Sequence, residues 1–178
     1  MHLTANPEPK VSYFECNLQV VEIFVSPGHD YWSREGAGRL QHGIQRVSQA
    51  ECVAGRGLKG DRYFEAAPNH PGQVSFMTLE AIQEIRLKFR LPKLPAGIFR
   101  RNVVVCGGNL SELLGRQFQI QGVLFEGCQE CRPCHWMDRV VAAGTQAFMR
   151  DNFRGGLRAK ILSDGPISIA NKIGLTPH

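Results

Sequence analysis

The stretch Cys128-Gln129-Glu130-Cys131-Arg132-Pro133-Cys134-His135-Trp136 contains three of the six cysteines in a chain of 178 residues. The cysteines recur at every third position, and a histidine follows the last of them. Two apolar runs before it, 118–120 and 123–125, predict a β-hairpin that turns at Gln121-Gly122 and leads the chain into the cysteines. Because thiolates are nucleophiles and soft metal ligands, we expect the function to depend on these sulfurs.

Outward from this stretch, short apolar runs alternate with turns, which is typical of a mainly β protein. A helix is predicted over 79–89, with Thr78 as its cap and Pro92 beyond its end. Residues 136–153 predict one amphipathic helix or two short ones, with Gly144 as the weak point. Strands are predicted at 18–26, 44–53, 73–77, 103–105, 158–162 and 167–169. The expected fold is therefore α+β, a closed mixed β-barrel with peripheral helices.

The length and composition fit one globular domain, which we expect to span residues 17–178. Residues 1–16 are polar and Pro-rich and predict a flexible lead-in. The glycines and proline of residues 27–43 predict a long loop. No apolar run reaches the ~18 residues of a membrane span, and the N-terminus lacks the pattern of a signal peptide. We therefore expect a cytoplasmic protein with reduced thiols and no membrane partner.

The net charge of +5 permits an acidic partner, either nucleic acid or a small phosphorylated molecule. The cations lie singly at turns and have no aromatic residues interleaved with them, so nucleic acid is the less favoured partner. Scattered cations of this kind fit one anion pocket, although a solvated basic surface is the simpler alternative.

The turn Gly55-Arg56-Gly57-Leu58-Lys59-Gly60-Asp61-Arg62-Tyr63 has the composition of an anion-binding loop. Its glycines let the backbone approach a ligand closely, and its cations supply donors for an oxyanion. The Gly-Lys-Ser/Thr ending of a P-loop is absent. A tight basic turn is the alternative, in which Asp61 bonds backbone N–H groups.

Five motifs occur in a fixed order along roughly residues 44–170. They are Gly57-Leu58-Lys59-Gly60-Asp61-Arg62, then Arg101-Asn102-Val103-Val104-Val105 with Gly107, then Gly115 to Ile120, then Pro133-Cys134, and last Arg154-Gly155-Gly156-Leu157-Arg158-Ala159. In this order they resemble the MOSC domain, the C-terminal domain of molybdenum cofactor sulfurases, here as a stand-alone protein. The resemblance implies the barrel-like fold described above.

The resemblance also implies a function for Cys134, which matches the characteristic cysteine of the family. In sulfurase-type members this cysteine is proposed to carry sulfur as a persulfide. In amidoxime-reducing members it ligates the molybdenum of a pterin cofactor (molybdopterin), and related stand-alone proteins act on N-hydroxylated bases. Pyridoxal phosphate is a label of the wider family, and no lysine context here supports it. Possible protein partners are a cysteine desulfurase or an external electron donor.

A bound pterin cofactor would need cations for its phosphate. The residues that the motifs nominate for cofactor binding are Lys59, Asp61, Arg62, Arg101, Asn102, Arg154 and Arg158. Cys134 is the nominated catalytic residue and molybdenum ligand, with Cys128 and Cys131 as weaker metal candidates.

Cys128 and Cys131 are additional to the Pro-Cys motif of the family, and two alternative roles remain open for them. Together with Cys134 and His135 they could hold a structural zinc or an iron–sulfur cluster, if Cys16, Cys52 or Cys106 completed the ligand set. Alternatively, Cys128 or Cys131 could resolve an oxidised Cys134 as a disulfide. Cys16, Cys52 and Cys106 are otherwise expected to be small buried hydrophobes.

Overall fold

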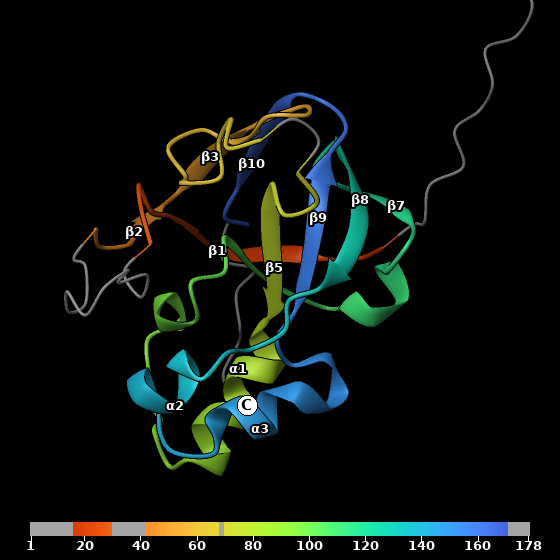
Figure 1. Ribbon diagram of the computed structural model, residues 1–178. Helices are drawn as coiled ribbons and strands as arrows, with labels where there is room; N and C mark the ends of the chain where they lie inside the picture. Colours follow the sequence, from red (N-terminus) through yellow and green to blue (C-terminus); the bar gives the residue numbers. More distant parts are fainter. Residues whose placement is uncertain (1–15, 30–41, 68–69, 171–178) are drawn as a thin grey trace, which may run out of the picture.

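The computed structural model describes residues 16–29, 42–67 and 70–170 (Figure 1). The predicted lead-in up to residue 15 and most of the predicted loop 27–43 lie outside the described residues. The strands are β1 Gln19–Val25, β2 Gln45–Val47, β3 Gln49–Val53, β4 Gly57–Leu58, β5 Val74–Thr78, β6 Val103–Cys106, β7 Gln117–Ile120, β8 Val123–Glu130, β9 Leu157–Ile161 and β10 Gly165–Ser168. The α-helices are α1 Leu79–Lys88, α2 Trp136–Val140 and α3 Thr145–Arg150, and short 3-10 turns cover Ala96–Phe99, Leu110–Leu113 and Asp151–Phe153.

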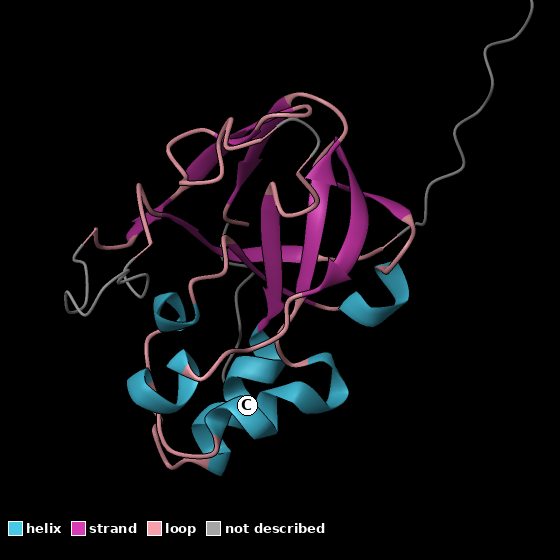
Figure 2. Cartoon of the chain, viewed as in Figure 1, coloured by secondary structure: helices cyan, strands magenta, loops and turns pink. Residues whose placement is uncertain are grey.

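The strands form two sheets within the described residues. A central sheet of seven strands has the order β2-β1-β6-β5-β9-β8-β7, and a smaller one has the order β10-β3-β4. β5 runs parallel to β6, whereas the other pairs in the central sheet are antiparallel. Figures 1 and 2 show α1, α2 and α3 gathered at one end of the molecule and β3 and β10 at the other.

The predicted closed barrel is wrong, because the edge strands β2 and β7 of the central sheet do not pair with each other. The run 44–53, predicted as one strand, divides at Ser48 into β2 and β3, which belong to different sheets. The chain therefore leaves the central sheet at its edge and builds a second sheet. That sheet covers the apolar face that closure of a barrel would have enclosed.

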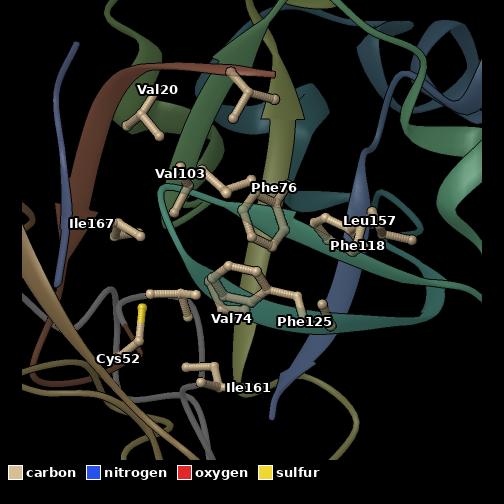
Figure 3. Close-up of a cluster of buried hydrophobic side chains, with 14 of the residues drawn as sticks. Val20, Cys52, Val74, Phe76, Val103, Phe118, Phe125, Leu157, Ile161 and Ile167 are labelled. Atoms are coloured by element: carbon tan, nitrogen blue, oxygen red, sulfur yellow. The ribbon is translucent and has the colours of Figure 1, made fainter. Parts of the chain in front are cut away.

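The core shows how the layers are held together. Strand side chains alternate between faces, so Phe76 packs under the small sheet while Met77 points to the helices. Figure 3 shows the first of these two clusters, in which Cys52 and Ile167 of the small sheet meet Phe76 and its neighbours of the central sheet. The helices α1 and α3 cover the opposite face with a second cluster. The fold is thus three layers: small sheet, central sheet and helices.

The helices form where the sequence indicates. The Thr78 side chain accepts the backbone N–H of Ala81 at 3.2 Å and caps α1, as predicted. Gly144, in the left-handed region at φ 87°, separates α2 from α3, so residues 136–153 are two helices rather than one. Among the described residues, no helix is long and apolar enough to cross a membrane.

Candidate functional site

A cavity of about 490 Å³ lies on the helix-facing side of the central sheet. Ser75 of β5 and Arg158 of β9 are cross-strand partners and both line it. We call it the arginine cavity, because six arginines and no Asp or Glu line it among the described residues. The six are Arg62, Arg100, Arg101, Arg132, Arg139 and Arg158. Cys131, Cys134 and His135 also line it.

The loop after β8 brings the cysteines to this cavity. The backbone N–H of Cys131 donates to the carbonyl of Gly156 at 2.7 Å, and its carbonyl accepts from Arg101 Nη2 at 3.2 Å. Cys131 is buried, whereas Cys134 is half-buried and its carbonyl accepts the N–H of Met137 at the start of α2. Within the described residues the Cys134 thiol makes no hydrogen bond, so it is available to a ligand.

Arg101 clamps three segments around the cavity. Its Nε donates to Gly155 O at 2.8 Å and its Nη1 to Phe99 O at 2.9 Å, in addition to the bond with Cys131. All three acceptors are neutral carbonyl groups. The guanidinium therefore fixes the backbone without losing its charge to a carboxylate.

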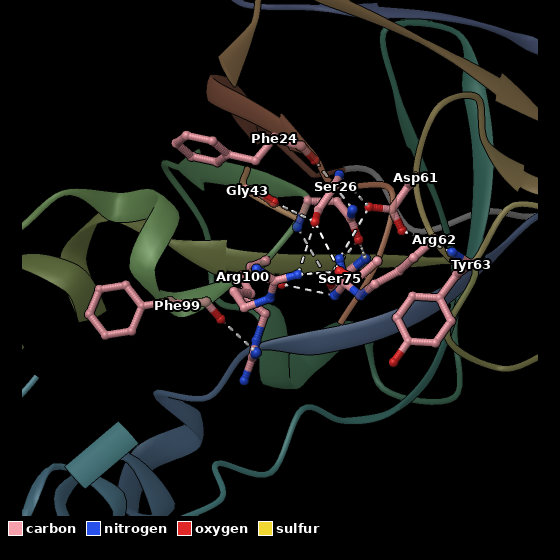
Figure 4. Close-up of polar contacts among 12 residues, drawn as sticks. Phe24, Ser26, Gly43, Asp61, Arg62, Tyr63, Ser75, Phe99 and Arg100 are labelled. Carbon is pink, nitrogen blue, oxygen red and sulfur yellow. Dashed lines mark hydrogen bonds and ion pairs between the residues drawn. The ribbon is translucent and has the colours of Figure 1, made fainter. Parts of the chain in front are cut away.

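Arg62 and Arg100 belong to a buried polar network (Figure 4). Arg100 Nη2 donates to Ser26 Oγ at 2.9 Å, and Arg62 Nη1 lies 3.3 Å from Asp61 Oδ2. Asp61 accepts the backbone N–H groups of Ser26 and Tyr63, each at 3.2 Å, as the turn interpretation predicted. The Asp61 carboxylate thus pairs with Arg62, whereas Arg100 donates to the neutral oxygens of Ser26 and Gly28. Arg62 Nε is buried with no hydrogen-bond partner among the described residues, which favours an added acceptor.

Four of the seven nominated cofactor-binding residues do not line the cavity: Asp61, described above, and Lys59, Asn102 and Arg154. Lys59 is half-exposed and pairs with Glu51 at 2.8 Å. Arg154 pairs with Glu84 at 2.6 Å and lies over the ring of Phe148. Asn102 is buried and accepts from Ser75 Oγ at 2.8 Å. Asn102 thus holds Ser75, a residue of the wall, while Lys59 and Arg154 bind elsewhere.

The MOSC domain family model matches residues 67–173. The chain belongs to the MOSC domain family. That family is associated with the molybdenum cofactor. No curated protein sequence matches this chain.

Solved structures show the same fold. YuaD from Bacillus subtilis is 16% identical, with a TM-score of 0.64 over 85% of this chain and 92% of its own. YiiM from Geobacillus stearothermophilus is 17% identical, with a TM-score of 0.62 over 85% of this chain and 71% of its own. YiiM from Escherichia coli is 16% identical, with a TM-score of 0.56 over 83% of this chain, and this chain spans 65% of its length. An uncharacterised protein is 16% identical, with a TM-score of 0.61, and this chain spans 64% of its length.

The three clustered cysteines of this MOSC domain do not meet at one point. Among the described residues, no three His, Cys, Asp or Glu side chains form a group that could hold a metal. Cys128 lines a separate cavity, and its thiol donates to Glu126 O at 3.3 Å. Burial raises the pKa of the Cys128 thiol and keeps it protonated. The arrangement therefore does not support the zinc or iron–sulfur alternative, and it leaves Cys131 as the cysteine that shares a cavity with Cys134.

The nominated site residues did not include Tyr63, Arg100 or Arg139, although Arg100 is one of the turn cations expected to form an anion pocket and all three line the arginine cavity of the MOSC domain. Arg100 adjoins the nominated Arg101, and Arg139 follows Cys134 closely in sequence, so proximity to a motif was the available signal. Tyr63 directly follows the basic glycine turn. A second cavity of about 430 Å³ shares Arg100 and Trp136 with the first but is lined mostly by apolar residues, with no cysteine or histidine among those described.

Proposed function

We propose that this MOSC domain binds a molybdenum cofactor (molybdopterin) in the arginine cavity, with Cys134 as the sulfur ligand of the metal. The observation that carries the proposal is an uncommitted thiol in a cavity with six arginines and no carboxylate among its described lining residues. A cysteine sulfur is a soft ligand that suits such a metal.

The residues present fit the cofactor. Its phosphate would bind to Arg62, Arg101 and Arg158, which line the cavity, and the buried Arg62 Nε supplies a donor that has no other partner among the described residues. A metal that arrives with the ligands of its own pterin needs few from the protein. One cysteine is therefore sufficient, in keeping with the absence of a three-residue ligand group in the described chain.

The reaction we propose is reduction of an N-hydroxylated base to the amine and water. When bound, the cofactor would supply the electron transfer, and the electrons would come from an external donor protein, because the sequence has no flavin or nicotinamide fingerprint. The protein residues would hold the cofactor, orient the base and provide protons. A volume of about 490 Å³ is within the range of small-molecule sites.

A second candidate is a sulfur carrier that receives a persulfide on Cys134 from a cysteine desulfurase. The observation that favours it is the presence of Cys131 in the same cavity. A second thiol could displace the outer sulfur as sulfide and form a disulfide with Cys134, which a cellular thiol would then reduce.

The test compares Cys134→Ser with Cys128→Ser, since Cys128 lines a different cavity. Protein is purified without oxygen from a host that makes molybdopterin, and the molybdenum content and intact mass are measured. We expect stoichiometric molybdenum in the wild type and in Cys128→Ser. Cys134→Ser should lose more than the roughly 10–100-fold that a supporting residue costs.

Equal molybdenum in both variants would contradict the role of Cys134. Stoichiometric zinc or iron in the wild type would contradict the cofactor itself. An intact mass increased by one sulfur atom, without a pterin, would favour the sulfur carrier.

A further inference from the structure

Tyr63 lies on the wall of the arginine cavity with its ring held on several sides. The ring of His70 stacks on it at a centroid distance of 5.3 Å, and His29 meets it edge-on, also at 5.3 Å. The guanidinium carbon of Arg62 is 4.8 Å from the ring centroid. These contacts fix the direction of the phenol without any help from its hydroxyl group.

The hydroxyl group of Tyr63 is available to a ligand. It makes no hydrogen bond with the described part of the chain, although a phenol in a partly buried position normally finds a partner. Figure 4 shows the oxygen pointing away from the network of Asp61, Ser26 and Arg100. Because Tyr63 and Cys134 line the same cavity, a molecule bound at Cys134 can meet this oxygen.

His135 is the other side chain on the wall that could give up a proton, whereas several donors on the wall and around the ring are less suited. The arginines stay protonated at all physiological pH values. The hydroxyl of Ser75 is bonded to Asn102 Oδ1 at 2.8 Å. His70 stacks on the ring and does not line the cavity, and its Nδ1 accepts the N–H of Gly72 at 3.0 Å. His29 is held neutral, because burial and the charges of Arg62 and Arg100 lower its pKa.

We propose that Tyr63 hydrogen-bonds to the N–O oxygen of the bound base and donates a proton to it as the N–O bond breaks. This inference rests on the proposed function. Two electrons enter from the external donor protein, one proton comes from Tyr63 and one from solvent. The base leaves as its amine, the hydroxyl leaves as water, and the tyrosinate regains its proton from solvent.

Tyr63→Phe tests the role cleanly, since phenylalanine keeps the ring contacts and removes one oxygen. With the cofactor-loaded enzyme we expect kcat to fall roughly 10²–10⁴-fold and KM to change little. An analogue whose N–O bond releases a nitrophenolate needs no proton to leave, so the defect should vanish with that substrate. Ser168→Ala removes an exposed hydroxyl in β10 and should leave both substrates unaffected.

A binding measurement supplies a readout that does not need turnover. Calorimetry with cofactor-free protein compares an N-hydroxylated adenine with adenine itself. The wild type should prefer the N-hydroxylated base by about 3–10-fold, which is the value of one hydrogen bond, and Tyr63→Phe should lose this preference.

The outcomes separate the two proposals. Equal discrimination by wild type and Tyr63→Phe, or a kcat defect that is the same for both leaving groups, would overturn the role of Tyr63. The proposed function would still stand if the wild type carries molybdenum and reduces the base. Wild type without molybdenum would overturn the proposed function, and the calorimetric preference would then decide the contact of Tyr63 by itself.

Discussion

At the scale of single residues, burial makes the cysteines of this MOSC domain differ in reactivity, as Cys52 and Cys134 show. Cys52 is fully buried beside Glu51, and burial together with that negative charge raises the pKa of its thiol to about 12. Cys134 is half-buried among arginines. Because the thiolate is the reactive form, Cys52 is an inert part of the core.

The raised pKa of Cys52 predicts that the free energy of unfolding changes with pH in the alkaline range. From pH 9.0, the ordinary thiol pKa, to about 12, the folded chain keeps a proton that the unfolded chain loses. The folded state thus binds more protons, so the free energy of unfolding falls as pH rises through this window. The limiting slope for one group is about 1.4 kcal/mol per pH unit, and below this window the contribution is complete.

Urea denaturation of wild type and Cys52→Ala at about pH 8 and pH 10.5 checks this sign. Comparison with the variant cancels the lysines and tyrosines that titrate in the same range. We expect the variant to lose less stability than the wild type between the two pH values. Parallel losses would show that Cys52 titrates normally.

At the scale of elements, close approach of two loops holds the site together. A Cβ atom added at Gly155, between the 3-10 turn Asp151–Phe153 and β9, would overlap the carbonyl oxygen of Cys131. The obstacle is backbone, so no side-chain rotation can relieve it. Arg101 spans the same two loops by bonding both Gly155 and Cys131. Position 155 thus requires glycine if the loop of Cys134 is to keep its place.

Gly155→Ala should therefore destabilise the protein by about 1–3 kcal/mol and lower its molybdenum content. The control is Gly144→Ala, which has open space around it but a φ of 87°. That variant should cost about 1–2 kcal/mol through backbone strain alone and keep its molybdenum. Urea denaturation and metal analysis measure both effects. A Gly155→Ala protein with wild-type stability and metal content would show that the two loops can separate freely.

Helices whose bounds are set by nearby residues were predictable from sequence, whereas strands whose pairing depends on distant segments were not. The cap at Thr78 and the break at Gly144 act within a few residues, so α1, α2 and α3 follow from local pattern. The division at Ser48 depends on which sheet each half joins, and an alternating run carries no such information.

The same distinction between local sequence signals and contacts from distant segments applies to the candidate site. Of the residues that the motifs nominated, Cys134, Arg62, Arg101 and Arg158 line one cavity, and their roles stay predictions. Lys59 and Arg154 were nominated on the same grounds, but tertiary structure sets Glu51 and Glu84 beside them. Tyr63 was missed because its importance comes from the rings of His29 and His70, which reach it from other segments.

At the scale of the whole molecule, an open central sheet needs a cover for its second apolar face. The small sheet β10-β3-β4 provides it, and Ile167 of β10 lies fully buried in the same cluster as Phe76 and Phe125. If this cover belongs to the one cooperative core, damage to it must weaken the entire fold. If it were an appendage, damage would release the small sheet and leave the central sheet folded.

Ile167→Ala distinguishes these cases. Removal of its buried methyl groups leaves a cavity between the sheets and should cost about 2–5 kcal/mol, in a single transition with an unchanged urea m-value. Leu87→Ala is the matched control, since Leu87 is 79% exposed and should change stability by less than about 0.5 kcal/mol. Two transitions in Ile167→Ala, monitored by fluorescence and by circular dichroism, would show that the small sheet unfolds alone. A single shifted transition would show that the small sheet does what closure of a barrel would have done. It would enclose the apolar face of the central sheet and make the stability of that sheet depend on the whole chain.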